Sequence, residues 1–355
     1  MGKLFWSLFV VQSSDNLKSK TCAELRRSIQ NLKFSVALAA AVVLVSSSVA
    51  QAQPGKKVPK IGYLSVRSAP SEREEAFKQG LRELGWVDGE NISIEYRWAK
   101  EKPELLPELA ADLVRLKVNL IVAPFTAAVE AAKKATPTIP IVMSPAADPV
   151  ASKLIASLDR PGANITGLSL MGPELAGKRL ELLREIVPRL NHVAFIAPGG
   201  DPAAALFVKE AQEAAQKLGL ELQSFAVSNL GEIDSIFSTI KKRRVGALVI
   251  HPLFVSFPDQ NRRIVELAVR HRLPSISDLT DFAEAGGLLS YGANIFALYH
   301  RAGYFVDKIL KGAKPATLPV EQPRVFETAI NLKTAKQIGL TISPQILARA
   351  DKVIK

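Results

Sequence analysis

Hydroxyl side chains that end apolar segments are the first candidates for chemistry in this sequence. Ser65, Thr126 and Ser144 each follow a short apolar run with the composition of a β-strand. At such a position a hydroxyl can cap the helix that comes next, and the same helix start can accept a carboxylate. The three residues are therefore candidate ligand contacts, with helix capping as the alternative for each.

Catalytic and metal-binding motifs are not found. The sequence contains no GxxxxGK[ST], no GxGxxG after a strand, no HExxH and no GxSxG. The single cysteine, Cys22, can form neither a disulfide nor a thiolate metal site within the chain. The four histidines have no metal-ligand spacing: His192, His251, His271 and His300. We therefore expect a protein that is not an enzyme and needs no metal or cofactor.

Composition points to a globular protein of about two domains. The chain has 355 residues, of which 48% are hydrophobic and 23% are charged. Its formal net charge is +12, but lysine and arginine are scattered through amphipathic segments, without the interleaved aromatic residues that stack on bases. This pattern argues against nucleic acid as a partner.

The N-terminal region has the three-part plan of a secretory signal. Arg26, Arg27 and Lys33 precede an uncharged apolar run over 34–45, and small residues follow it up to Ala52. The apolar core of about twelve residues is shorter than the roughly twenty that cross a bilayer. We expect residues 1–52 to be a signal peptide with a long basic region, cleaved after Ala52, and the mature protein to reach the periplasm. An uncleaved signal anchor is the alternative.

The remaining chain alternates between short β-rich runs and longer amphipathic helical patterns, which is typical of βα units on parallel sheets. A first series ends near residue 168 and a second begins near 174, with a turn-rich connector over 159–164. Ligands of such sheets bind at the carboxyl ends of the strands. The expected binding loops are 65–71, 123–126, 144–149, 197–202, 251–258 and 277–281.

Short phrases along the chain resemble the ABC transporter substrate-binding protein family, which includes tryptophan- and tyrosine-associated members. The resemblance covers essentially residues 58–355 and is densest in the C-terminal third. The phrases that carry it are 138–142, 148–150, 160–169, 284–292, 309–315, 318–323, 330–336 and 339–342.

This resemblance implies an α/β fold of the type I periplasmic binding architecture, in which two Rossmann-like lobes with parallel sheets are joined by three hinge crossovers. The first lobe is expected to comprise 58–168 plus 283–315, and the second 169–282 plus 316–355. The family also implies a monomer that captures a small molecule, amino-acid-like or another small organic solute. It would then deliver this solute to the permease and ATPase subunits of an ABC importer, and meet the membrane only through that permease. A ligand-sensing module of a signalling system would share the same fold.

For an amino-acid-like ligand, Ser65 or Thr126 would hold the carboxylate, and Asp148 or Asp278 would pair with the ammonium group. Phe125, where many relatives have a glycine- or threonine-rich turn, would offer an apolar surface. The other candidates from the same loops and the C-terminal third are Arg67, Ser144 and Tyr291. Capping, turn formation and lobe packing are the alternatives for these residues.

Overall fold

The computed structural model of the protein describes residues 58–355 and the single residue Arg27. The expected signal peptide, residues 1–52, and its cleavage site after Ala52 therefore lie outside the described residues, apart from Arg27. Within the described part of the chain, no helix is long and apolar enough to cross a membrane.

The first lobe is built on a five-stranded parallel sheet with the strand order β2-β1-β3-β4-β5. Strand β3 is buried at every position, because helices cover both faces of the sheet, and its sequence is accordingly apolar throughout. Its elements are β1 (Lys60–Ser65), α3 (Glu72–Glu83), β2 (Ser93–Trp98), α4 (Leu106–Arg115), β3 (Leu120–Ala123), α5 (Phe125–Ala135), β4 (Ile141–Ala146) and β5 (Ile165–Ser169).

The second lobe contains a seven-stranded sheet with the order β12-β11-β10-β9-β8-β6-β7, in which only β10 and β11 pair antiparallel. Its strands are β6 (His192–Pro198), β7 (Glu221–Val227), β8 (Ala247–Ile250), β9 (Ser275–Ser277), β10 (Leu289–Ala293), β11 (Phe326–Asn331) and β12 (Lys352–Ile354). Its helices are α6 (Ala176–Ile186), α7 (Ala204–Lys217), α8 (Glu232–Lys242), α9 (Pro258–Arg270), α10 (Thr280–Glu284), α12 (Leu332–Ile338) and α13 (Pro344–Leu347).

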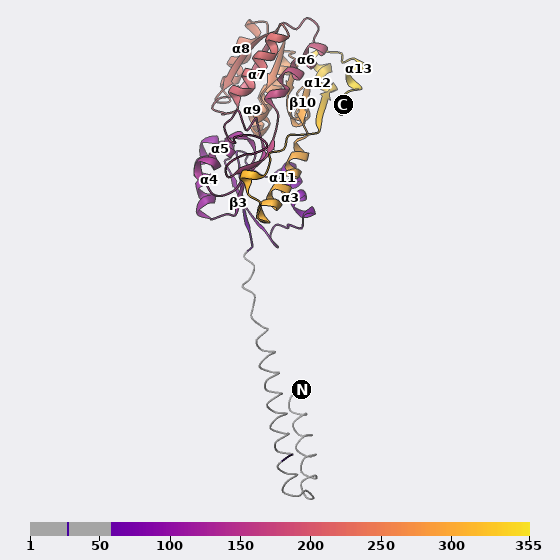
Figure 1. Ribbon diagram of the computed structural model, residues 1–355. Coiled ribbons are helices and arrows are strands. Elements are labelled where there is room, and N and C mark those ends of the chain that lie inside the picture. The colour runs from indigo at the N-terminus through magenta and orange to yellow at the C-terminus, as the bar shows by residue number, and fades with distance from the viewer. Residues whose placement is uncertain (1–26, 28–57) are drawn as a thin grey trace, which may run out of the picture. The chain divides into compact units, whose positions relative to one another are not determined.

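Helix α11 (Ile295–Leu310) returns to the first lobe and packs along α3 (Figure 1). The two helices approach closely because each carries a glycine at the contact, Gly80 on α3 and Gly303 on α11. A Cβ atom on Gly80 would lie 2.0 Å from the backbone oxygen of His300. Glycine is therefore required at this position for α11 to lie where it does.

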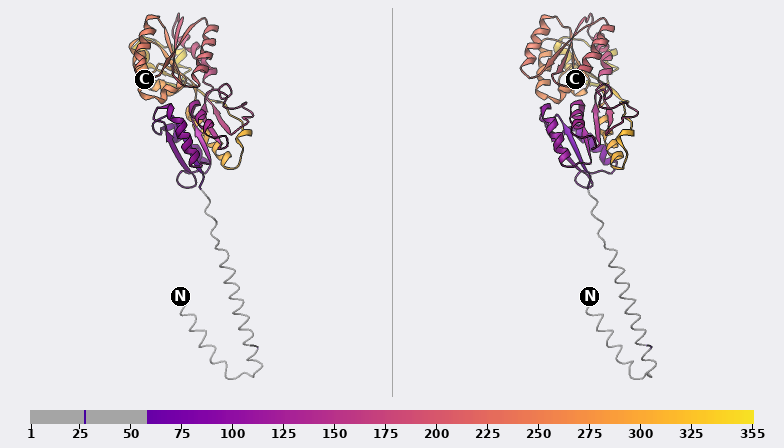
Figure 2. Two further views of the ribbon diagram at one scale, coloured as in Figure 1. Left: turned by 90° about the vertical axis from the view of Figure 1, so that its left-hand side faces the viewer. Right: turned by 60° about the vertical axis from the view of Figure 1, so that its left-hand side comes forward.

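The chain crosses between the lobes three times, after β5, after β10 and before β11. The two views in Figure 2 show each sheet inside its own lobe with helices on both sides. These features confirm the expected type I periplasmic binding architecture.

Strand pairing shifts two of the expected lobe boundaries. The apolar run that forms β10 fills the position between β9 and β11, so the second crossing follows Ala293 rather than residue 283. The first lobe also extends beyond residue 315, because Glu321 bridges to Leu168 and Val320 is buried in the first-lobe core.

Candidate ligand-binding site

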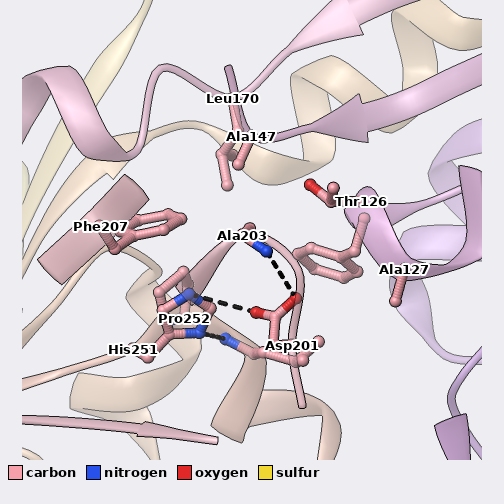
Figure 3. Close-up of a pocket in the computed structure, with 11 residues that line it drawn as sticks. Thr126, Ala127, Ala147, Leu170, Asp201, Ala203, Phe207, His251 and Pro252 are labelled. Atoms are coloured by element: carbon pink, nitrogen blue, oxygen red, sulfur yellow. Dashed lines mark hydrogen bonds and ion pairs between the residues drawn. The ribbon is translucent and has the colours of Figure 1, made fainter. Parts of the chain in front are cut away.

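A small cavity lies between the carboxyl ends of the two sheets and is lined by residues from both lobes. Its free volume is about 10 Å³, roughly the room that one water molecule needs, so a larger ligand fits only if the walls move apart. Eleven residues line it (Figure 3): Phe125, Thr126, Ala127, Ala147, Leu170, Asp201, Ala203, Phe207, His251, Pro252 and Leu253.

The first-lobe wall of the cavity is the N-terminus of α5. The N-cap residue, Pro124, has an extended backbone and makes no side-chain capping bond. The first backbone N–H groups of a helix have no acceptor within the helix, so those of this turn are available to a ligand. The Thr126 hydroxyl is buried beside them and makes no hydrogen bond within the described residues. This wall therefore presents unused donors to the cavity.

The second-lobe wall carries one carboxylate. Asp201, in the loop between β6 and α7, accepts a hydrogen bond from the Ala203 N–H at 3.1 Å. Its Oδ2 atom lies 3.3 Å from Nε2 of the buried His251, which follows β8 (Figure 3). The ring of Phe207 meets the imidazole edge-on, with 4.4 Å between the ring centroids. The Asp201 carboxylate thus lies beside the His251 imidazole, which itself packs against the apolar ring of Phe207.

Burial sets the charges of this pair. It lowers the pKa of His251 to about 3, helped by the positive charge of Arg179, so the imidazole is neutral near pH 7. The Leu253 N–H donates to Nδ1 at 3.3 Å, so the neutral ring carries its proton on Nε2, which makes no hydrogen bond within the described residues. Burial also raises the pKa of Asp201 to about 6. At pH 7 the carboxylate is ionised, and it is the only full charge among the lining residues.

Asp278, which we expected at the ligand ammonium, is engaged inside the second lobe. Its Oδ2 atom lies 3.2 Å from Nη1 of Arg179, and both side chains are buried. Arg179 also donates to the backbone oxygens of Gly172 and Tyr291. Burial raises the pKa of Asp278 to about 7, against the opposing effect of the arginine. The pair joins the first crossover to β10 and lies outside the lining of the cavity.

Of the eight expected ligand contacts, Phe125 and Thr126 line the cavity. Ser65 and Ser144 are fully buried, and the Ser65 hydroxyl accepts from the N–H of Arg67 at 3.3 Å.

The remaining expected contacts lie outside the cavity lining. Asp148 accepts from the N–H groups of Val150 and Ala151, as a turn residue does. Tyr291 on β10 packs against Phe326, with 6.5 Å between the ring centroids.

Nine of the eleven lining residues were not among the expected contacts, and the most notable of them are Asp201, Phe207 and His251. Asp201 and His251 fall within expected strand-end loops, 197–202 and 251–258, so the sequence indicated their location but not which side chains face the cavity. Among the described residues, no group of three or more His, Cys, Asp or Glu side chains could hold a metal ion.

A family model described as ABC transporter substrate binding protein matches residues 65–354. The chain belongs to this family. It is therefore a substrate-binding protein of ABC transport, a class that binds small molecules. The tyrosine-binding protein of Clostridioides difficile (strain R20291) is 27% identical over 288 residues, which are 80% of this chain and 82% of that protein.

Solved structures show the same fold. The ABC domain from Streptococcus pneumoniae in complex with L-Trp matches with a TM-score of 0.76 and 28% identity, over 83% of this chain and 99% of that one. A conserved domain protein from Vibrio cholerae matches with a TM-score of 0.77 and 25% identity, over 84% of this chain and 100% of that one.

The ligand-free, open structure of a substrate-binding protein with adhesive properties from Clostridium difficile matches with a TM-score of 0.61 and 25% identity, over 84% of this chain and 100% of that one.

Proposed function

We propose that this protein captures a solute with an α-amino acid head group between its lobes and delivers it to the permease and ATPase subunits of an ABC importer. One observation carries the proposal: a buried carboxylate and an uncapped helix N-terminus face the same cavity from opposite lobes. An α-amino acid is a zwitterion whose two charges match these two walls.

Asp201 would pair with the ligand ammonium. Its carboxylate is ionised at pH 7, is partly desolvated, and has no lysine or arginine beside it among the lining residues. An ammonium group would supply the missing countercharge, and a charge-assisted hydrogen bond of this kind is about twice as strong as a neutral one. The neutral His251 lies beside the carboxylate, with Nε2 3.3 Å from Oδ2.

The N-terminus of α5 would hold the ligand carboxylate. The helix supplies unpaired N–H groups and the positive end of its dipole. Thr126 adds a buried hydroxyl without a partner, which a carboxylate oxygen would satisfy.

The rest of the cavity would take an apolar side chain. Phe125 and Leu170 contribute from the first lobe and its crossover, and Phe207 and Leu253 from the second lobe. Hydrophobic and aromatic side chains of this kind form most of the lining of small-molecule sites, and a few polar groups fix the orientation of the ligand. The known ligands of the two relatives, tyrosine and L-Trp, belong to this chemical class.

The mechanism contains no bond-making step. In an open form the two walls would be separated, and each would bind only half of the ligand. Closure would bring Asp201 and α5 together, so a zwitterion has higher affinity for the closed form and shifts the population toward it. The closed protein would then dock on the permease outside the cytoplasm, which fits the secretory signal expected over 1–52 and delivery in the periplasm.

Thermal unfolding of the mature protein tests this assignment. We expect stabilisation by L-tyrosine, L-tryptophan or L-leucine, with a ligand at 100 times its Kd adding about 2.7 kcal/mol. Tyramine, which lacks the carboxylate, and 3-(4-hydroxyphenyl)propionate, which lacks the amine, should each bind at least tenfold more weakly than L-tyrosine. Equal binding of either analogue would contradict the zwitterion model, and no stabilisation by any of the amino acids would remove the ligand class.

A further inference from the structure

Phe125 has a backbone conformation that is unusual for its residue type. Its φ angle is +61°, in the left-handed region. Nine non-glycine residues in the described part of the chain have positive φ, and Phe125 alone among them is buried. Others, such as Lys117 and Arg244, directly follow helix C-caps, where this conformation is common. Phe125 instead begins a helix, at the ligand cavity.

A left-handed backbone is costly for phenylalanine, since the Cβ atom crowds the neighbouring carbonyl oxygen. Glycine has no such penalty, and asparagine has less. A bulky side chain persists in this conformation only where the surrounding structure holds it, and such positions cluster at binding sites. We therefore expect the side chain of Phe125 to have a role that glycine, which lacks a side chain, could not perform.

The position of the ring supplies that reason. Phe125 is 7% exposed and packs in an apolar cluster with Leu170 and Leu253, which also line the cavity. Phe207 and His251 line the second-lobe side of the same cavity. Because Phe125 precedes Thr126 and Ala127 at the helix start, its ring lies next to the proposed carboxylate site. A smaller residue here would leave the donors in place and enlarge the space beside them.

We propose that Phe125 is the residue that limits the size of the ligand side chain, and that its strained backbone holds the ring as a wall of the cavity. This inference rests on the proposed capture of an amino acid and adds to it a selection for smaller side chains. The small free volume of the cavity, about 10 Å³, is the expected consequence of such a wall.

The strain is measured by comparing two variants of the same residue. Phe125→Gly and Phe125→Ala both remove the ring, but only alanine keeps a Cβ atom in the left-handed conformation. We expect Phe125→Gly to unfold at a temperature about 2 °C higher than that of Phe125→Ala. Lys134, an exposed residue later in α5, is the matched control. There we expect Lys134→Gly to be less stable than Lys134→Ala, because glycine is the poorer helix former. Equal or lower stability of Phe125→Gly would overturn the proposed strain.

The size limit is measured by titrating L-leucine, L-phenylalanine, L-tryptophan and 3-(2-naphthyl)-L-alanine into the wild type and Phe125→Ala. We expect the ratio of Kd for the two largest ligands to Kd for L-leucine to fall at least about tenfold in the variant. Phe125→Leu should give an intermediate ratio, and it can replace the alanine variant in this test if Phe125→Ala does not fold.

The outcomes separate this inference from the proposed function. If the wild type binds the series and the ratios are unchanged in Phe125→Ala, Phe125 is not the wall, while amino-acid capture stands. If neither protein binds any member, amino-acid capture fails and the inference fails with it.

Discussion

Arg73 of the first lobe and Asp281 of the second form an ion pair, with Nη2 and Oδ2 2.5 Å apart. The arginine side chain is 1% exposed and the aspartate side chain 30% exposed. Nε and Nη1 of Arg73 are buried and have no hydrogen-bond partner within residues 58–355. Since neither residue lines the cavity, this contact can hold the two lobes together without touching a ligand there.

Removing the charge of Asp281 should weaken closure. In Asp281→Asn the buried guanidinium loses its countercharge, and opening would let water solvate it. We expect L-tyrosine affinity to fall about five- to thirtyfold, equivalent to about 1–2 kcal/mol. Small-angle X-ray scattering with saturating L-tyrosine should show a larger fraction of open molecules than for the wild type.

Asp234→Asn is the matched control. Asp234 pairs with Arg263 within the second lobe, between α8 and α9. Its removal should leave ligand affinity unchanged, and an equal loss of affinity in both variants would show that the Arg73–Asp281 contact has no special role in closure.

Ligand binding should weaken in mild acid. Burial raises the pKa of Asp201 to about 6, and an ammonium group binds only the ionised carboxylate. The affinity for L-tyrosine should therefore be full above pH 7 and fall about tenfold per pH unit below pH 6. Isothermal titration between pH 5 and 8 checks this, and Asp201→Asn should bind weakly with little pH dependence over that range. A wild-type affinity that is constant down to pH 5 would remove Asp201 as the ammonium partner.

The fold could be predicted because βα units repeat a strong local signal. Runs such as the one that forms β3 are apolar at every position, as strands covered on both faces must be, and amphipathic helices separate them. The lobe boundaries were less accessible. Whether 289–293 joins the first or the second sheet depends on its pairing with β9, just before it in the chain, and with β11, which follows only after the long helix α11.

The lining of the cavity could be predicted where a local rule applies and not elsewhere. Thr126, which lines the cavity, was a candidate because a hydroxyl at a strand-to-helix junction has a local meaning. Asp201 was missed because it follows two glycines in a turn, and only the fold brings Phe207 and His251 against it. Asp278 was assigned to the ligand because its partner, Arg179, lies on a helix of the second lobe almost one hundred residues earlier.

The buried Arg179–Asp278 pair should be essential for stability. In Arg179→Met, Asp278 keeps its burial and loses its countercharge, and breaking such a pair costs about 3–5 kcal/mol. The loss should be largest at neutral and alkaline pH. With its pKa in the folded protein raised above that in the unfolded chain, Asp278 takes up a proton on acidification and the unpaired charge disappears, so the deficit relative to the wild type should shrink as the pH falls toward 5.

Urea unfolding at pH 5 and pH 8 measures this difference. The double variant Arg179→Met/Asp278→Leu removes both charges and should recover most of the lost stability at pH 8. A single variant with the same deficit at both pH values would mean that Arg179 acts through its hydrogen bonds to Gly172 and Tyr291 rather than through its charge.

Replacement by alanine should have opposite effects at two helical glycines, one in the contact between α3 and α11 and one outside it. In Gly80→Ala the new Cβ would lie 2.0 Å from the backbone oxygen of His300, so α11 must move away from the first lobe. We expect a loss of at least about 2 kcal/mol in the free energy of unfolding, since overpacking against backbone typically costs about 1–3 kcal/mol or more.

Gly177 in α6 is the control, because its nearest neighbour to an added Cβ is Ala214 at 3.7 Å, an ordinary contact. Gly177→Ala should be more stable than the wild type by up to about 1 kcal/mol, through helix propensity alone. Urea unfolding of both variants measures these free energies. An unchanged free energy of unfolding in Gly80→Ala would show that α3 and α11 are less tightly packed than their glycines imply.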